Sequence, residues 1–363
     1  MQRTNLFIVT LTLSSLSFAQ GQNSAHWWGN SNERSLNQPL NSPGAKAMPL
    51  ISVRANRFVD PQGNPVLFRG VSIGDPDKLQ GQGHWNRETF EHVRAYGANI
   101  VRIPVHPVAW RERGPVEYLH LLDQAVEWCT DLRLYIDLDW HSIGNLETEL
   151  FQDPMYNTSK TETFAFWRTA AVHFGANNTV ALFELFNEPT TADGRLGPVS
   201  WADWKRTMED LTRVVRGANP QIVPLIAGFD WAYYLTELRE APISADNVGY
   251  VTHPYPNKKI QPWEPKWEED FGFASARYPV IATEIGYTDP TENRGSPYNY
   301  SDYGPAIVNY LEGRGISWIA WAYDPNWGPQ LLKSWNFDLT KAGEFFKQQM
   351  SAPVSTGESR PGQ

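Results

Sequence analysis

The sequence of 363 residues has a single cysteine, Cys129, so no intrachain disulfide can form. It also has no excess of positive charge, because 31 Lys and Arg stand against 40 Asp and Glu, a formal net charge of −9. Such a chain is not expected to bind nucleic acid or an anionic membrane surface. Without cross-links it must rely on a hydrophobic core, and its length suits one large α/β domain.

Long apolar runs are also missing. Residues 6–13 form a short apolar stretch behind Arg3, and the small residues Ser17 and Ala19 follow it. The stretch is too short to anchor the chain in a bilayer. This pattern predicts a signal peptide over residues 1–19, and so a secreted or periplasmic protein without a membrane anchor.

The composition changes twice along the chain. Residues 20–50 are rich in Asn, Ser, Gly and Pro and show no apolar period, which predicts a linker or a strap on the domain surface. A single domain is expected over residues 51–350, followed by a disordered tail over 351–363. A monomer is the expected oligomeric state.

Within residues 51–350, apolar strand-like runs alternate with amphipathic stretches, after a small hairpin predicted over residues 51–59. Strands are expected over residues 66–72, 99–105, 132–140, 180–188, 221–229, 247–255, 279–286 and 315–323, and helices over 86–96, 117–130, 161–174, 201–216, 232–239, 263–277, 303–312 and 341–350. The fold class is therefore α/β, and eight strand–helix units predict a (β/α)8 TIM barrel with a short N-terminal hairpin. An open doubly wound sheet is the alternative, although no G-x-G-x-x-G motif or P-loop opens any of the helices.

Polar groups stand where these strands end. The run 181–189 is apolar until Asn187 and Glu188, and Pro189 stops it; residues 279–282 lead in the same way into Glu284. A carboxylate at the end of a buried strand is costly unless it is paired or used. Since the strand ends of a barrel meet at one face, we expect the two glutamates to lie together there as an acid and a nucleophile.

The other strand ends complete a pattern that resembles glycoside hydrolase family 5, the cellulase family, over roughly residues 50–350. Its residues, in chain order, are Arg102, His141, Asn187, Glu188, His253, Tyr255, Glu284 and Trp321. The ordered set is far more specific than the Asn-Glu-Pro motif by itself, and no position of it departs from the family pattern. The resemblance implies a secreted, endo-acting, retaining β-glycoside hydrolase that cleaves β-1,4-linked glucan, of cellulose type or mixed linkage, without a cofactor.

The resemblance also implies a role for each residue. Glu188 would be the acid/base, and Glu284 the nucleophile, with Arg102 and Tyr255 holding it ionised. Asn187 would bind the 2-hydroxyl of the sugar, and His253 would support Glu188. His141 would contact the sugar at the cleavage position, and Trp321 would form the floor there.

Three alternatives remain open at this stage. Asp139, His141 and His253 could be ligands of a metal ion, although the pattern offers no His-x-His on the first strand. A carbohydrate-binding barrel without activity is a second possibility, although both glutamates are intact. The same eight residues would also serve an enzyme acting on mannan, xyloglucan or β-1,3-glucan.

Trp231, Trp263 and Trp327 follow strands and are candidate sugar platforms.

Overall fold

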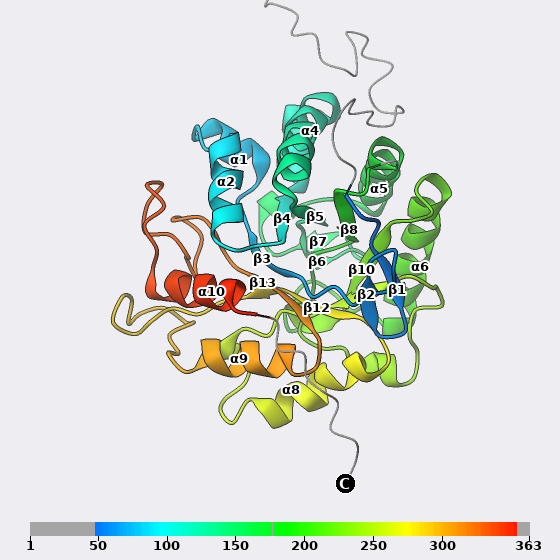
Figure 1. The fold of residues 1–363 in the computed structure, drawn as a ribbon. Helices are drawn as coiled ribbons and strands as arrows, with labels where there is room; N and C mark the ends of the chain where they lie inside the picture. Colours follow the sequence, from blue (N-terminus) through cyan, green and yellow to red (C-terminus); the bar gives the residue numbers. More distant parts are fainter. Residues whose placement is uncertain (1–47, 176, 354–363) are drawn as a thin grey trace, which may run out of the picture.

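The computed structural model describes residues 48–175 and 177–353, in which eight parallel strands close into a barrel (Figure 1). Around the barrel the strands follow chain order: β3 (Arg69–Ser72), β4 (Ile100–Val105), β5 (Tyr135–Trp140), β8 (Val180–Glu184), β10 (Val223–Ala227), β11 (Gly249–Val251), β12 (Val280–Ile285) and β13 (Ser317–Ala320). Helices connect the strands along the outside. The predicted (β/α)8 barrel is confirmed.

The helices surround the barrel in the ribbon view of Figure 1. They are α1 (Pro76–Gly81), α2 (Arg87–Ala95), α3 (Pro107–Arg113), α4 (Pro115–Leu132), α5 (Lys160–Phe174), α6 (Trp201–Ala218), α7 (Phe229–Ala232), α8 (Glu264–Asp270), α9 (Tyr303–Glu312) and α10 (Lys341–Ser351). In α6 the Ser200 hydroxyl caps the first turn by accepting from the Asp203 amide, and Trp204, Leu211 and Val215 are buried. The helix predicted over residues 201–216 is confirmed. No helix of the described ranges is both long and apolar enough to cross a membrane.

The N-terminal end of the barrel is closed by the predicted hairpin, β1 (Ser52–Arg54) paired antiparallel with β2 (Arg57–Val59). Phe58 of the hairpin packs on Phe68, with ring centroids 5.5 Å apart. Ile100 and Leu182 belong to the same apolar cluster. Because side chains alternate along a strand, the residues two positions further on point to the same interior, and there the lining becomes polar.

Two strands end four residues earlier than the sequence pattern predicts, at 184 instead of 188 and at 251 instead of 255. Strand β8 stops at Glu184, and Glu188 lies in a separate small sheet of β7 (Leu150–Phe151), β6 (Ile143–Asn145) and β9 (Glu188–Pro189). Strand β11 stops at Val251, so His253 and Tyr255 stand in the loop after it. Part of the mouth of the barrel is therefore formed by loops that leave the strands.

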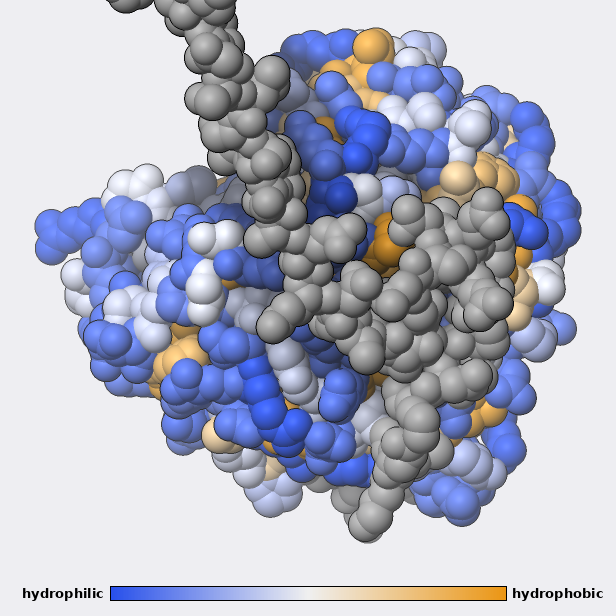
Figure 2. All heavy atoms as spheres, turned by 90° about the horizontal axis from the view of Figure 1, so that it is seen from above, coloured by the Kyte–Doolittle hydropathy of each residue, from blue (hydrophilic) through white to orange (hydrophobic). Residues whose placement is uncertain are grey.

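The surface of the described residues is mainly hydrophilic in the view of Figure 2, with hydrophobic residues in small separate groups. The expected signal peptide (residues 1–19), nearly all of the expected strap (20–50) and residues 354–363 of the expected tail lie outside the described residues. The helix α10 extends through Ser351, one residue into that tail.

Candidate active site

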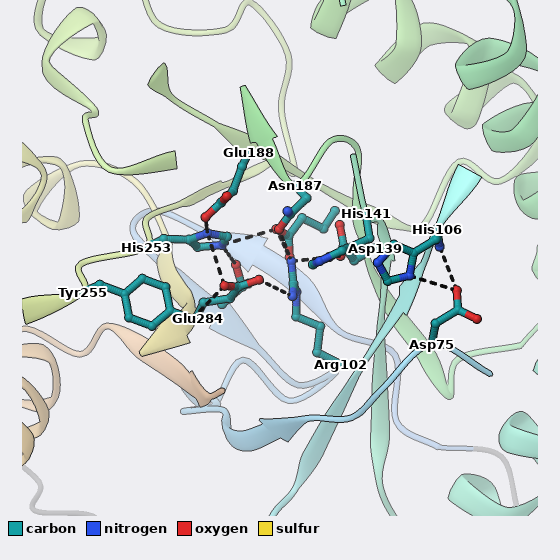
Figure 3. Close-up of polar contacts among 12 residues, drawn as sticks. Asp75, Arg102, His106, Asp139, His141, Asn187, Glu188, His253, Tyr255 and Glu284 are labelled. Carbon is teal, nitrogen blue, oxygen red and sulfur yellow. Dashed lines mark hydrogen bonds and ion pairs between the residues drawn. The ribbon is translucent and has the colours of Figure 1, made fainter. Parts of the chain in front are cut away.

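Arg102 lies at the centre of a buried network at the mouth of the barrel (Figure 3). Its Nη1 donates to Glu284 Oε1 over 2.8 Å, and its Nε and Nη2 donate to Glu184 over 2.8 and 2.9 Å. Nη2 also donates to Asn187 Oδ1 over 2.7 Å and lies 2.9 Å from Asp139 Oδ2. The planar guanidinium thus joins β4 to residues of β5, β8 and β12, which a lysine with one ammonium group could not do.

Glu284 stands near the end of β12 and is 5% exposed. Besides Arg102, the Tyr255 hydroxyl donates to its Oε2 over 2.8 Å. Burial raises the pKa of Glu284 above its ordinary value, and the positive charges of His253 and Arg102 act against that rise. Two donors aimed at one carboxyl group favour its ionised form and fix its orientation.

Glu188 and His253 form the second part of the site. His253 Nδ1 lies 3.0 Å from Glu188 Oε1 and 3.8 Å from Glu284 Oε2, and its Nε2 lies 2.9 Å from Thr283 Oγ1. Burial by itself would lower the pKa of His253, but the carboxylates of Glu284, Glu184 and Glu188 raise it to about 9. The imidazole is therefore a cation at neutral pH and donates to Glu188.

The two catalytic candidates are close enough to act on one bond. One ligand atom each of Glu188, His253 and Glu284 lies within 4.8 Å of the others. The same three residues are the group in the described ranges whose spacing could hold a metal ion, instead of the Asp139, His141 and His253 set considered from the sequence. A metal needs a lone pair on the imidazole, whereas both ring nitrogens of His253 have partners and its pKa is about 9. The site fits two carboxyl groups and a cation better than a metal centre.

His141 and Trp321 form the wall beside Arg102. Their rings lie parallel, with centroids 5.5 Å apart and an interplanar angle of 3°. Burial lowers the pKa of His141 well below its usual value, helped by His106, Arg102 and His253, so the ring is neutral. Its Nδ1 lies 2.6 Å from Asp139 Oδ2, and burial raises the pKa of Asp139 well above its ordinary value.

The three further tryptophans proposed from the sequence differ in their surroundings. Trp231 is half-buried, donates from Nε1 to Gln152 Oε1 over 2.7 Å and lies under the Lys258 ammonium. Trp327 lies 6.2 Å from the His106 ring, measured between centroids, and lines a small pocket together with Trp321.

Trp263, in contrast, is only 3% exposed. Its ring stacks on Trp267 at 5.8 Å and meets Tyr303 edge-on at 5.6 Å. Its Nε1 donates to the Lys259 carbonyl. The structure does not bring Trp263 to the cluster of predicted residues. It is a packing residue of the helical layer, and the expectation of a sugar platform there is corrected.

The eight residues of the sequence pattern all gather at the mouth of the barrel, joined by hydrogen bonds or ring contacts. Glu184 and Asp139 were not among them, although both bind Arg102. Burial would raise the pKa of Glu184, but Arg102 and His253 lower it to about 2. The sequence did contain a signal for Glu184, because it is an acid inside an otherwise apolar strand. It stands two positions after Leu182, so both side chains point to the interior face of the strand.

The comparison with known proteins decides the family. Residues 59–327 match the family model described as cellulase, glycosyl hydrolase family 5. The chain belongs to this family. Among curated members, it is 26% identical over 283 residues to endoglucanase E-5 of Thermobifida fusca, and 24% over 320 residues to endoglucanase N of Pectobacterium atrosepticum. These alignments cover 75% and 85% of the chain but 55% and 66% of the relatives, so the chain spans about half to two thirds of their length.

Solved structures of family 5 members agree with the barrel. A β-glucanase of Saccharophagus degradans, solved in complex with cellotetraose, is 40% identical with a TM-score of 0.85, over 89% of this chain and 98% of that one. The catalytic domain of the Thermobifida fusca endoglucanase Cel5A has 22% identity and a TM-score of 0.67, over 83% of this chain and 97% of that one, and this likeness concerns the fold alone.

Proposed function

We propose that this family 5 protein is an endo-acting β-glucanase that cleaves β-1,4-linked glucan, of cellulose type or mixed linkage, with retention of configuration. The observation that supports it most is the spacing of Glu188 and Glu284, whose oxygen atoms approach within 4.8 Å. Retaining glycosidases hold their two carboxyl groups about 5–5.5 Å apart, whereas inverting enzymes need about 6.5–9.5 Å to admit a water. The close approach of the two carboxyl groups supports the retaining arrangement.

The first step of the proposed reaction requires the protonated form of Glu188. The Glu284 carboxylate attacks the anomeric carbon while Glu188 donates its proton to the departing glycosidic oxygen. The glycosidic C–O bond breaks as an ester bond to Glu284 forms. In the second step Glu188 takes a proton from a water molecule, whose oxygen attacks the same carbon and releases Glu284. Two displacements return the β configuration.

The neighbouring residues suit this sequence of charges. Arg102 and Tyr255 hold Glu284 ionised before attack, and they receive it again as a carboxylate after the ester is broken. The Asn187 carbonyl oxygen is held by Arg102, and its Nδ2 has no hydrogen-bond partner among the described residues. That amide is therefore available to the sugar's 2-hydroxyl, a contact that strengthens in the transition state.

The substrate assignment follows from the walls of the site and from the relatives. Trp321 and neutral His141 offer an apolar ring face and a free ring nitrogen to a neutral sugar. We propose that Trp231 is a platform for the departing part of the glucan, on the side of Glu188. Trp327 would be a platform for the other part of the glucan, on the opposite side. The relatives named endoglucanase and β-glucanase support glucan over other β-glycans. We further propose a monomer exported by residues 1–19.

The test is a panel of soluble cellulose derivatives, mixed-linkage glucan, mannan, xyloglucan and β-1,3-glucan, with product analysis and NMR of the first-formed anomer. We expect oligosaccharides of several lengths from β-1,4-linked glucan and an initial β-anomer. An initial α-anomer would contradict retention, and turnover of mannan alone would contradict the substrate. Binding of glucan without any turnover would point to the inactive carbohydrate-binding barrel instead.

A further inference from the structure

Asp137 lies in the interior of the barrel beside Arg102 and is not explained by the proposed catalytic roles. It stands on β5, directly opposite Arg102 in the pairing of β4 with β5, and two residues before Asp139 on the same interior face. The residue is completely buried. Within the described ranges, neither oxygen of its carboxyl group accepts a hydrogen bond from a donor group.

A buried carboxylate without any donor is among the costliest groups a protein can contain, so such a group takes up a proton instead. On the neighbouring strand β8, Asp137 is paired with Leu182, and Glu184 is the next residue of that strand on the same face. Two carboxyl groups can share a hydrogen bond only when one of them carries the proton. Glu184 already accepts from Arg102 on both of its oxygens, which favours its ionised form.

The electrostatics place the proton on the same residue. Burial, followed by the charge of Glu184, raises the pKa of Asp137 well above its ordinary value. Burial acts on Glu184 as well, but Arg102 and His253 outweigh it and lower the pKa of Glu184 to about 2. The pKa of Asp137 is thus raised and that of Glu184 lowered, as in other carboxyl pairs that share one proton.

We propose that Asp137 is a neutral carboxylic acid whose hydroxyl donates to Glu184, and that this hydrogen bond fixes Arg102 in the position from which it holds Glu284. Asp137 is then a positioning residue for the proposed reaction, separated from the nucleophile by Glu184 and Arg102. Its hydroxyl orients Glu184, and Glu184 binds Nε and Nη2 of Arg102. Nη1 is thereby left aimed at Glu284.

The proton also limits the negative charge of the site. The charged groups that act on Asp137 are Glu184 of β8, Arg102 of β4, His253 after β11 and its neighbour Asp139 of β5. Arg102 in turn contacts Glu284, and His253 contacts Glu188. Arg102 and His253 are the cations among them. One more anion in this layer would oppose the ionisation of Glu284, which must be a carboxylate to attack.

The activity test compares Asp137→Asn with Asp137→Ala. An asparagine keeps the shape and a donor for Glu184, so we expect its kcat/KM to stay within about threefold of wild type, with an unchanged pH profile. Alanine removes the donor, so Arg102 is fixed less well and stabilises the ionised form of Glu284 less. We therefore expect kcat/KM to fall at least tenfold and the acidic limb of the pH profile to move to higher pH. Asp123→Asn and Asp123→Ala are matched controls, since Asp123 is a buried acid bonded to His173 between α4 and α5.

Some outcomes would overturn the inference. Asparagine failing as badly as alanine, or shifting the acidic limb to lower pH, would mean that Asp137 is ionised. An alanine variant with wild-type rates would mean that Asp137 positions nothing. The activity arm rests on the proposed function, so a wild type inactive on every glucan would remove that function first.

A second measurement tests the proton itself without any substrate and does not need the alanine variant to fold. The infrared difference spectrum of wild type minus Asp137→Asn at pH 7 should show the carbonyl stretch of a protonated carboxyl group. An ordinary aspartate, with a pKa of about 3.9, is a carboxylate at this pH. A carboxylate band in its place would overturn the inference, whatever the enzyme acts on.

Discussion

His253 donates from Nδ1 to Glu188 Oε1 over 3.0 Å, and it does so as a cation buried between the two glutamates. The imidazolium exists because three carboxylates surround it and compensate the cost of burying the charge. The arrangement couples the protonation of the site to the stability of the fold.

The first prediction concerns the pH dependence of stability. The pKa of His253 is raised to about 9 in the folded chain, against about 6.5 when unfolded. Its contribution is therefore fully present below pH 6.5 and is lost as pH rises through 9. This contribution is on the order of 3 kcal/mol. His253→Gln should lower the free energy of unfolding at pH 6 more than at pH 10, measured by urea denaturation.

His92→Gln is the control for this prediction, because His92 stacks on Phe337 in the outer layer. It should change the free energy of unfolding equally at both pH values. An equal loss at pH 6 and pH 10 for His253→Gln would show that the imidazole is not charged in the folded protein.

The second prediction concerns Glu284. Glu284→Gln should lower kcat by about 10³-fold or more without unfolding the chain, because an amide cannot attack the anomeric carbon. In the wild type, burial raises the pKa of this glutamate, so the acidic limb of kcat/KM should lie above the ordinary glutamate value of about 4.3. The surface variant Glu268→Gln should leave both quantities unchanged, and a Glu284→Gln enzyme with near wild-type turnover would refute the nucleophile.

The third prediction separates the two glutamates. Glu188→Ala should lower turnover of glucan by about 10²–10⁴-fold but spare the first step on activated aryl glycosides, whose leaving group needs no proton. Added azide should then restore turnover and yield a β-glycosyl azide, since a small anion needs no general base. Glu284→Ala with azide should give the α-product, so NMR of the azides assigns the roles, and exchanged products would reverse them.

The fourth prediction concerns Arg102. Arg102→Met leaves several buried carboxyl groups without their cation and should lower the free energy of unfolding by about 3–5 kcal/mol. It should also lower kcat at least 100-fold, measured well below the melting temperature, because Glu284 loses its charge-assisted donor. Arg69→Met is the matched control, since Arg69 is buried against Glu312 on the outside of β3. It should lose stability but keep kcat within about threefold, and an equal loss of kcat in both variants would reduce Arg102 to a stability role.

Most of the fold was predictable because it follows from local patterns. The period of apolar residues distinguishes strands from helices, as for α6 and α9, and the residues of α9 were predicted without error. Strand ends were less predictable. The apolar run before Glu188 continues past Glu184, but the pairing of β8 with its neighbours stops there, which depends on strands distant in sequence.

The candidate site divides in the same way. The residues at the strand ends could be read from local patterns, and a closed parallel barrel brings such ends to one mouth, so Glu188 and Glu284 meet there. How the groups share charge depends on contacts between distant strands. Whether a buried acid is ionised depends on donors from other strands, as the Arg102 contacts to Glu184 and the lack of donors at Asp137 show. The burial of Trp263 was decided in the same way, by the aromatic rings of α8 and α9 packed against it.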